Sequence, residues 1–199
     1  MFYRPDSVEH VLNPTMQFVV TGNDPQAARD VAAATGATAY IDDREGAGDL
    51  PFRTLVRAVT DRPGLLDAAA GIGRYIVVAR PQRVRPSGAE PADADGIIQV
   101  NALIAARHLD HIGADTHWRD THAPLALKHH IGMTQYTQLS VVHTISGPVY
   151  DGFALCEFDS LTDFRERFFD GPEGREVILA DIAKFADLER SPRRLVAHR

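Results

Sequence analysis

Short apolar runs alternate with helical patterns over the first 80 residues of the chain. Four runs have the length and composition of strands, at 16–20, 37–41, 52–60 and 75–79. Between them, helices are predicted at 26–35 and 61–71, each with an early proline, Pro25 and Pro63. The order strand, helix, strand, strand, helix, strand is that of a split-βαβ, ferredoxin-like unit.

The same order of elements recurs in the second half of the chain. Strands are predicted at 97–106, 138–145, 153–158 and 194–197, and helices at 115–130, 160–169 and 173–185. Ser160 and Asp163 form a capping box for the second of these helices. The two halves therefore predict the same topology without obvious sequence identity.

A small, acidic segment without apolar periodicity separates the halves. We expect a degenerate ferredoxin-like half at 1–86, a linker at 87–95 and a second ferredoxin-like half at 96–199. A sheet with both helices on one face must bury its other face. The sequence thus predicts an α+β fold of tandem ferredoxin-like repeats that form an intramolecular pseudo-dimer like a dimeric α/β barrel. The alternative is two lobes that each pair with another chain.

Composition narrows the partners and the compartment. The 199 residues are 44% hydrophobic and carry 21 Lys+Arg against 27 Asp+Glu, so clustered cations for nucleic acid are not expected. No apolar run is long enough for a bilayer, and the N-terminal residues lack a signal-peptide pattern. The single cysteine, Cys156, is predicted to be a small buried residue. We expect a cytoplasmic protein without membrane or nucleic-acid partners.

The most informative pattern for chemistry is the helix predicted at 115–130. Trp118, His122, Leu125 and His129 follow a spacing of i, i+4, i+7 and i+11, which places them on one inward stripe. Pro124 removes a helical hydrogen bond, so a kink beside His122 is expected there. The alternative for His122 is a core histidine satisfied by a hydrogen bond.

A second anomaly is an acidic residue on the apolar face of the last helix. Asp181 shares that face with Ile178, Ile182 and Phe185. A buried carboxylate needs a partner, and His122 could meet it across the two helices. Such a pair is expected to hold the charge of His122 to higher pH than in a free imidazole. Asp181 could instead tie down a loop or a backbone N–H.

These motifs and their order resemble the EthD family over 96–199, about half of the chain. The resemblance rests on Trp118, His122-Ala123-Pro124, Gly132, Tyr136, Asp151-Gly152, Asp181 and Phe185. It implies a domain that pairs sheet to sheet, as in the dimeric α/β-barrel superfamily, which includes polyketide cyclases and dehydratases, small monooxygenases and haem-handling enzymes. EthD itself accompanies a cytochrome P450 system for ether degradation. The helix 26–35 has no Trp or His, so one site per chain is expected.

The nine histidines raise the question of a metal. His108 and His111 could ligate together, but two imidazoles do not complete a site, and His129 and His130 point apart on a helix. We therefore expect no metal and no cofactor, and we interpret His108, His111 and His130 as surface residues.

The leading hypothesis is a cofactor-independent acid–base enzyme, a lyase, dehydratase or cyclase, acting on a hydrophobic aromatic or polyketide-like carbonyl compound. His122 and Asp181 form the candidate catalytic pair. The candidate ligand-binding residues are Trp118, Leu125, His129, Tyr136, His143, Phe153 and Phe158. The alternatives are a cofactor-poor monooxygenase and a non-catalytic accessory or ligand-binding protein of a catabolic pathway. A homodimer of pseudo-dimers is left open.

Overall fold

The computed structural model describes residues 13–45, 50–85, 96–192 and 195–197. The predicted linker at 87–95 lies outside them. The strands are β1 (Thr15–Gly22), β2 (Thr38–Ile41), β3 (Thr54–Ala58), β4 (Gly73–Arg83), β5 (Ile97–Leu103), β6 (Met133–Ser146), β7 (Gly152–Phe158) and β8 (Leu195–Ala197). The helices are α1 (Pro25–Thr35), η2 (Pro63–Ala69), α2 (His111–His117), η3 (Trp118–His122), α3 (Ala123–His129), α4 (Leu161–Glu166) and α5 (Pro172–Phe185).

All eight strands belong to one antiparallel sheet in the order β2-β3-β1-β4-β6-β7-β5-β8. The long pairing of β4 with β6 joins the halves, so the sheet is continuous through the middle of the molecule. Its outer strands approach each other where the backbone N–H of Val196 on β8 donates to Oδ2 of Asp42, 3.0 Å away, just after β2. The α+β class is confirmed, and the sheet is close to a closed barrel. Whether the halves are tandem ferredoxin-like repeats remains a prediction.

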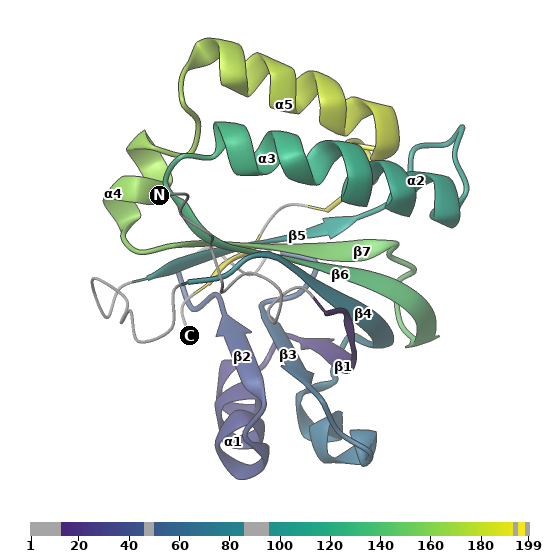
Figure 1. The fold of residues 1–199 in the computed structure, drawn as a ribbon. Helices are drawn as coiled ribbons and strands as arrows, with labels where there is room; N and C mark the ends of the chain where they lie inside the picture. The colour runs from purple at the N-terminus through teal and green to yellow at the C-terminus, as the bar shows by residue number, and fades with distance from the viewer. Residues whose placement is uncertain (1–12, 46–49, 86–95, 193–194, 198–199) are drawn as a thin grey trace, which may run out of the picture.

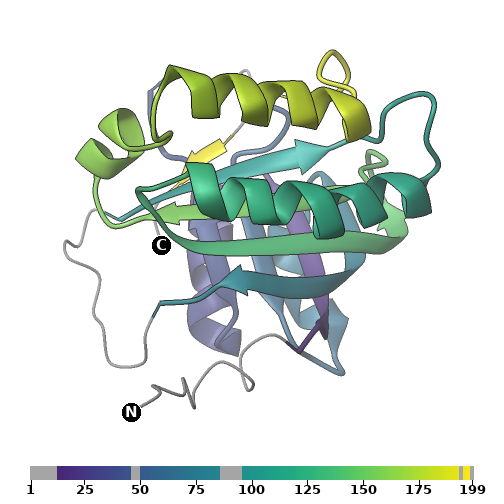
Figure 2. The same ribbon diagram turned by 45° about the horizontal axis from the view of Figure 1, so that its top comes forward.

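The sheet curves around a core to which both halves contribute. Val19, Leu55 and Tyr75 pack there with Leu139 and Phe153. Helices cover the outside: α1 and η2 lie over the N-terminal strands, and α3 and α5 lie over β5, β6 and β7 (Figure 1). Figure 2 shows α3 and α5 side by side above the sheet. The helical layer of the C-terminal half therefore packs on its own strands.

Two predicted helices differ from the observed ones. The segment expected at 61–71 is the 3₁₀ helix η2, with backbone N–H groups of Leu65 and Ala70 donating three residues back to Arg62 and Asp67. A short segment that starts with Pro-Gly favours this tighter form. The helix expected from 115 begins earlier, at His111, because the Asp110 side chain caps it through the N–H of Gly113. Within the described residues no helix is long and apolar enough to cross a membrane.

Candidate functional site

The helix that carries His122 contains a π-turn. Elements α2, η3 and α3 follow one another without a break, and residues Trp118–His122 form the π segment. Its hydrogen bond runs from the N–H of Ala123 to the carbonyl of Trp118, five residues back. The predicted kink near Pro124 is therefore a widened turn just before that proline. π-turns inside α-helices are frequent at functional sites.

The π-turn brings two histidines to one carboxylate. His117 and His122 are five residues apart, which places them on different faces of a regular α-helix but about one turn apart where the bonding is i to i+5. His117 Nε2 lies 3.0 Å from Oδ1 of Asp181, and His122 Nδ1 lies 3.0 Å from Oδ2. The contact expected between His122 and Asp181 is present. His117 is an additional partner.

Asp181 is buried on α5, with 2% of its surface exposed. Burial by itself raises the pKa of this carboxyl, but the hydrogen bonds from His117 and His122 outweigh it and lower the pKa overall. Lys184, one turn further along α5, places its Nζ 3.5 Å from Oδ1. Asp181 is therefore an ionised acceptor at neutral pH, and each imidazole donates a hydrogen bond to it.

His122 is buried and packs against Phe185, with the ring centroids 5.0 Å apart. Burial lowers its pKa below the usual value, and the hydrogen bond to Asp181 offsets this only in part. The expectation that the pair would hold the charge of His122 to higher pH is therefore wrong, because desolvation outweighs pairing. An ionised Asp181 can only accept, so Nδ1 of His122 carries the proton and Nε2 keeps its lone pair.

A cavity of about 340 Å³ lies beneath this pair, between the helical layer and the sheet. His122, Trp118 and Phe185 belong to its lining. It reaches the surface at Leu179 and Leu188, which are 40% and 56% exposed. Its volume falls in the range of small-molecule sites.

The cavity exists because the central strand of its floor carries small side chains. On β7, Ala154 and Cys156 line the cavity, whereas Phe153 and Leu155, which alternate with them, fill the barrel core. Gly152 continues the helix-facing row. An added Cβ there would lie 2.5 Å from Cζ3 of Trp118 and 2.9 Å from the carbonyl oxygen of Leu139. Gly152 thus lets the indole of Trp118 lie directly on the strand.

We expect Gly152→Ala to displace the indole of Trp118 and to lower the free energy of unfolding by about 1–3 kcal/mol, because neither the ring nor the backbone carbonyl can yield freely. Trp118 is the only tryptophan, so its fluorescence reports the change together with urea unfolding. Gly64→Ala is the control, since the nearest atom to its added Cβ is 3.9 Å away. Unchanged emission and stability for Gly152→Ala would contradict the close packing.

Trp118 is tied to the floor by a buried polar network. Its Nε1–H donates to the hydroxyl of Tyr136 over 2.9 Å. The side-chain amide of Gln138 donates to the same hydroxyl, 3.2 Å away, and to the carbonyl of Trp118, 2.9 Å away. The carbonyl of Trp118, which already accepts the π-turn bond from Ala123, thus accepts a second hydrogen bond from Gln138. Burial raises the pKa of Tyr136, which keeps its own proton available for donation.

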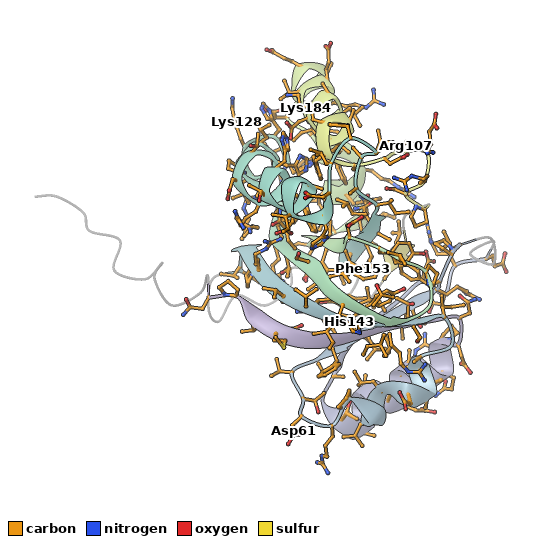
Figure 3. The ribbon with its side chains drawn as sticks, turned by 90° about the vertical axis from the view of Figure 1, so that its right-hand side faces the viewer. Asp61, Arg107, Lys128, His143, Phe153 and Lys184 are labelled. Carbon is orange, nitrogen blue, oxygen red and sulfur yellow. The ribbon has the colours of Figure 1, made fainter. Side chains whose placement is uncertain are left out.

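The remaining residues predicted to bind a ligand are in several places. Leu125 and Phe158 pack in the core beneath the helices, and His129 is buried with its Nδ1 2.9 Å from Oδ2 of Asp170. Phe153 lies in the barrel core and His143 is exposed on β6 (Figure 3). These five do not line the cavity. For Phe153 and His143 the reason is strand register, which turns their side chains away from the helical layer.

His130, expected at the surface, is buried and lines the cavity. Its Nδ1 lies 2.7 Å from the carbonyl of Phe168, so this nitrogen donates and Nε2 keeps a lone pair. Burial lowers the pKa of His130 to about 4, so the ring is neutral near pH 7. The expectation failed because His130 ends the helix, and its ring packs against Phe168 and Phe169.

The sequence-based list also omitted two amides on β5, Gln99 and Asn101, which line the cavity. Both occupy the helix-facing side of β5, where they alternate with Ile98, Val100 and Ala102 of the barrel core. Polar residues at every second position of a buried strand were the available signal. Cys156 also lines the cavity, and burial raises the pKa of its thiol to about 12, so it is not a thiolate nucleophile.

Over the described ranges, no group of three or more His, Cys, Asp or Glu side chains is arranged to hold a metal ion. His117 and His122 each hydrogen-bond one carboxylate oxygen of Asp181, so these two ring nitrogens do not point at a common position where a metal ion could lie.

Fold and site together define an α+β near-barrel with an apolar cavity and a buried His–Asp pair. Residues 106–189 match the family model described as the EthD domain, which confirms the resemblance for this part of the chain. A solved structure described as "Crystal structure study of anthrone oxidase-like protein" is similar in fold, with a TM-score of 0.53, 12% sequence identity, and coverage of 95% of this chain and 93% of that chain. No curated protein matches the sequence.

Proposed function

We propose that this protein binds a hydrophobic aromatic or polyketide-like carbonyl compound in the cavity and that His122 removes a proton from the carbon next to the carbonyl. The observation that carries the proposal is the environment of His122. This residue lines the cavity, and its Nδ1 is hydrogen-bonded to the buried carboxylate of Asp181. Because burial lowers its pKa, the ring is neutral near pH 7. A neutral imidazole with a free Nε2 is the form that acts as a general base.

Neighbouring groups support this step. The proton moves from carbon to Nε2 of His122, and the resulting imidazolium is stabilised by Asp181, which already holds the opposite nitrogen. The C–H electron pair moves into the carbonyl, which becomes an enolate. Tyr136 lines the cavity and accepts two N–H bonds, so its own O–H is the donor left for an enolate oxygen. Proton abstraction of this kind begins lyase, dehydratase and cyclase reactions alike.

The test is exchange of the C1 protons of 2-tetralone, which are benzylic and next to its carbonyl, in D₂O followed by NMR. The wild-type protein should accelerate exchange above the buffer rate, and His122→Gln should lose that acceleration by roughly 10²-fold or more while it still binds the ketone. His111→Gln is the matched control. His111 lies at the start of the continuous helix that also carries His122, and it pairs with Asp151, but it does not line the cavity. Equal exchange by His122→Gln and wild type would refute the base.

A second candidate is oxidation of the same carbanion by molecular oxygen. It is favoured by the fold shared with a protein described as anthrone oxidase-like. After His122 takes the proton, the carbanion and O₂ form a peroxide, and loss of water converts the CH₂ group to a carbonyl, so one O₂ is consumed and one H₂O is released. An oxygen electrode separates this reaction from exchange alone. Binding without exchange or oxygen uptake would favour a non-catalytic ligand carrier.

We propose further that a degenerate ferredoxin-like half at 1–86 and an EthD-like ferredoxin-like half at 96–199 are tandem repeats, with one site per chain. The orders β2-β3-β1-β4 and β6-β7-β5-β8 support this, since each half places its strands in the same relative sequence. In the described part of the N-terminal half, helices α1 and η2 carry no histidine. Instead, its strand β4 braces the helix of the site, with the Arg83 guanidinium donating to the carbonyl of Leu127 on α3 over 2.6 Å.

A further inference from the structure

The floor of the cavity carries a row of polar side chains, and the proton-transfer step uses only one of them, Tyr136. Strand pairing sets Gln99 on β5 opposite Cys156 on β7, and Cys156 opposite Tyr136 on β6. All three line the cavity, with neighbouring strands about 4.8 Å apart. Gln99 therefore enters from the sheet, whereas His122 enters from the helical layer on the other side of the cavity.

The side chain of Gln99 is incompletely satisfied. The residue is 95% buried, with a relative exposure of 5%. Its Nε2 donates to Oδ1 of Asn101 over 3.1 Å, and no partner for its Oε1 is found in the part of the chain that the structure describes. A buried amide oxygen without a partner is unusual and costs stability, so it calls for an explanation. A bound ligand that donates a hydrogen bond supplies one.

The lining limits which donor a ligand can bring. Among the described residues that surround the cavity there is no Asp, Glu, Lys or Arg, so none of them offers a counter-ion to a charged group of the ligand. Trp118, Phe168 and Phe185 supply aromatic rings, which suit a flat ring system. Nε2 of neutral His130 is a second acceptor in the same lining. A neutral hydroxyl fits best, and because it both donates and accepts, it satisfies the Gln99 amide in either orientation.

We propose that Gln99 is a specificity-determining residue that hydrogen-bonds a hydroxyl group on the ligand, and that the ligand class is therefore hydroxylated aromatic ketones. This inference rests on the proposed function for the carbonyl end of the ligand. The ketone lies at His122 and Tyr136, and the hydroxyl reaches Gln99 on β5.

The test compares two ligands that differ by one hydroxyl, 2-tetralone and 6-hydroxy-2-tetralone, by calorimetric titration. Wild-type protein should bind the hydroxylated ketone about tenfold more tightly, as expected for one hydrogen bond to a buried unpaired group. Gln99→Leu should bind both ketones equally, with unchanged or higher affinity for 2-tetralone. A preference that survives in Gln99→Leu would overturn the proposal, and so would wild-type protein that binds neither ketone.

A second measurement separates recognition from a structural role. If Gln99 is retained for the ligand, ligand-free Gln99→Leu should melt at a higher temperature than wild type, because an unpaired buried acceptor is removed. A lower melting temperature would assign Gln99 to the fold instead.

The outcome for His122 is independent of these results. Exchange of the C1 protons of 2-tetralone, which has no hydroxyl for Gln99 to bind, is compared between wild type and His122→Gln and should fail in His122→Gln. If wild type prefers the hydroxylated ketone through Gln99 but catalyses no exchange, the recognition role of Gln99 stands and the proposed base fails.

Discussion

Asp181→Asn should lower the rate of α-proton exchange by about 10²–10⁴-fold, no more than removal of the base itself, while ligand binding is retained. An ionised Asp181 accepts a hydrogen bond from the Nδ1–H of His122, so the lone pair is on Nε2 of a residue that lines the cavity. An asparagine presents one oxygen and one NH₂ group to two imidazoles, and that amide also lacks the charge that stabilises an imidazolium. Where the NH₂ group faces His122, the ring must carry its proton on Nε2 and cannot act as a base.

The matched control is Asp170→Asn, because Asp170 makes the same kind of contact with Nδ1 of His129 outside the cavity lining. This variant should exchange protons at the wild-type rate. If both variants lose activity equally, the effect is one of general destabilisation, and the positioning role of Asp181 is refuted.

The pH profile of wild-type exchange follows from the same geometry. His122 must be neutral to act as a base, and burial lowers its pKa below the 6.5 that is usual for histidine. The rate should therefore be flat above about pH 6.5 and should fall only in more acidic solution, as His122 becomes protonated. NMR exchange rates between pH 4.5 and 8 measure this. An inflection above pH 7 would contradict the observed burial.

Arg80→Met should lower the free energy of unfolding by about 3–5 kcal/mol, as expected when one partner of a buried ion pair is removed. Arg80 on β4 is 8% exposed and forms a two-pronged contact with Asp115 on α2, in which Nη1 lies 2.8 Å from Oδ2 and Nη2 also bonds Oδ1. Without the guanidinium, Asp115, whose side chain is only 17% exposed, is left as a largely buried charge. Urea unfolding at pH 7 measures the loss.

Two comparisons test the cause of this loss. Arg80→Met combined with Asp115→Leu should recover most of the stability, because both charges are then absent. Arg29→Met, which removes an exposed pair with Asp43, should cost no more than about 1 kcal/mol. An equal loss in Arg29→Met would show that burial is not the cause.

The pH dependence of the Arg80→Met effect has a defined sign. Burial raises the pKa of Asp115, but Arg80 outweighs it and lowers the pKa below 3.8. The pair therefore contributes stability above that pH and loses it as the pH falls through the lowered pKa. The difference between wild type and variant should shrink in acid.

Local patterns in the sequence predict much of this protein. The order of strands and helices follows from apolar runs and from capping residues such as Asp24, whose side chain accepts from the first N–H groups of α1. The inward positions of His122 and Asp181 follow from helical periodicity, which needs no knowledge of distant contacts. Their meeting follows from the side-by-side packing of two helices on one sheet.

Other features of the site were decided only by the tertiary structure. They depend on contacts between residues far apart in the sequence, or on the exact winding of a helix. The π-turn that brings His117 to Asp181 is one residue of extra winding, which the spacing of the sequence does not reveal. The cavity results from small side chains on β7 lying beneath the helices, and the unpaired oxygen of Gln99 becomes significant only once burial excludes water from it. The sequence determined which polar groups face inward. Packing determined which of them are paired and which remain available to a ligand, because desolvation and strand register are properties of the assembled fold.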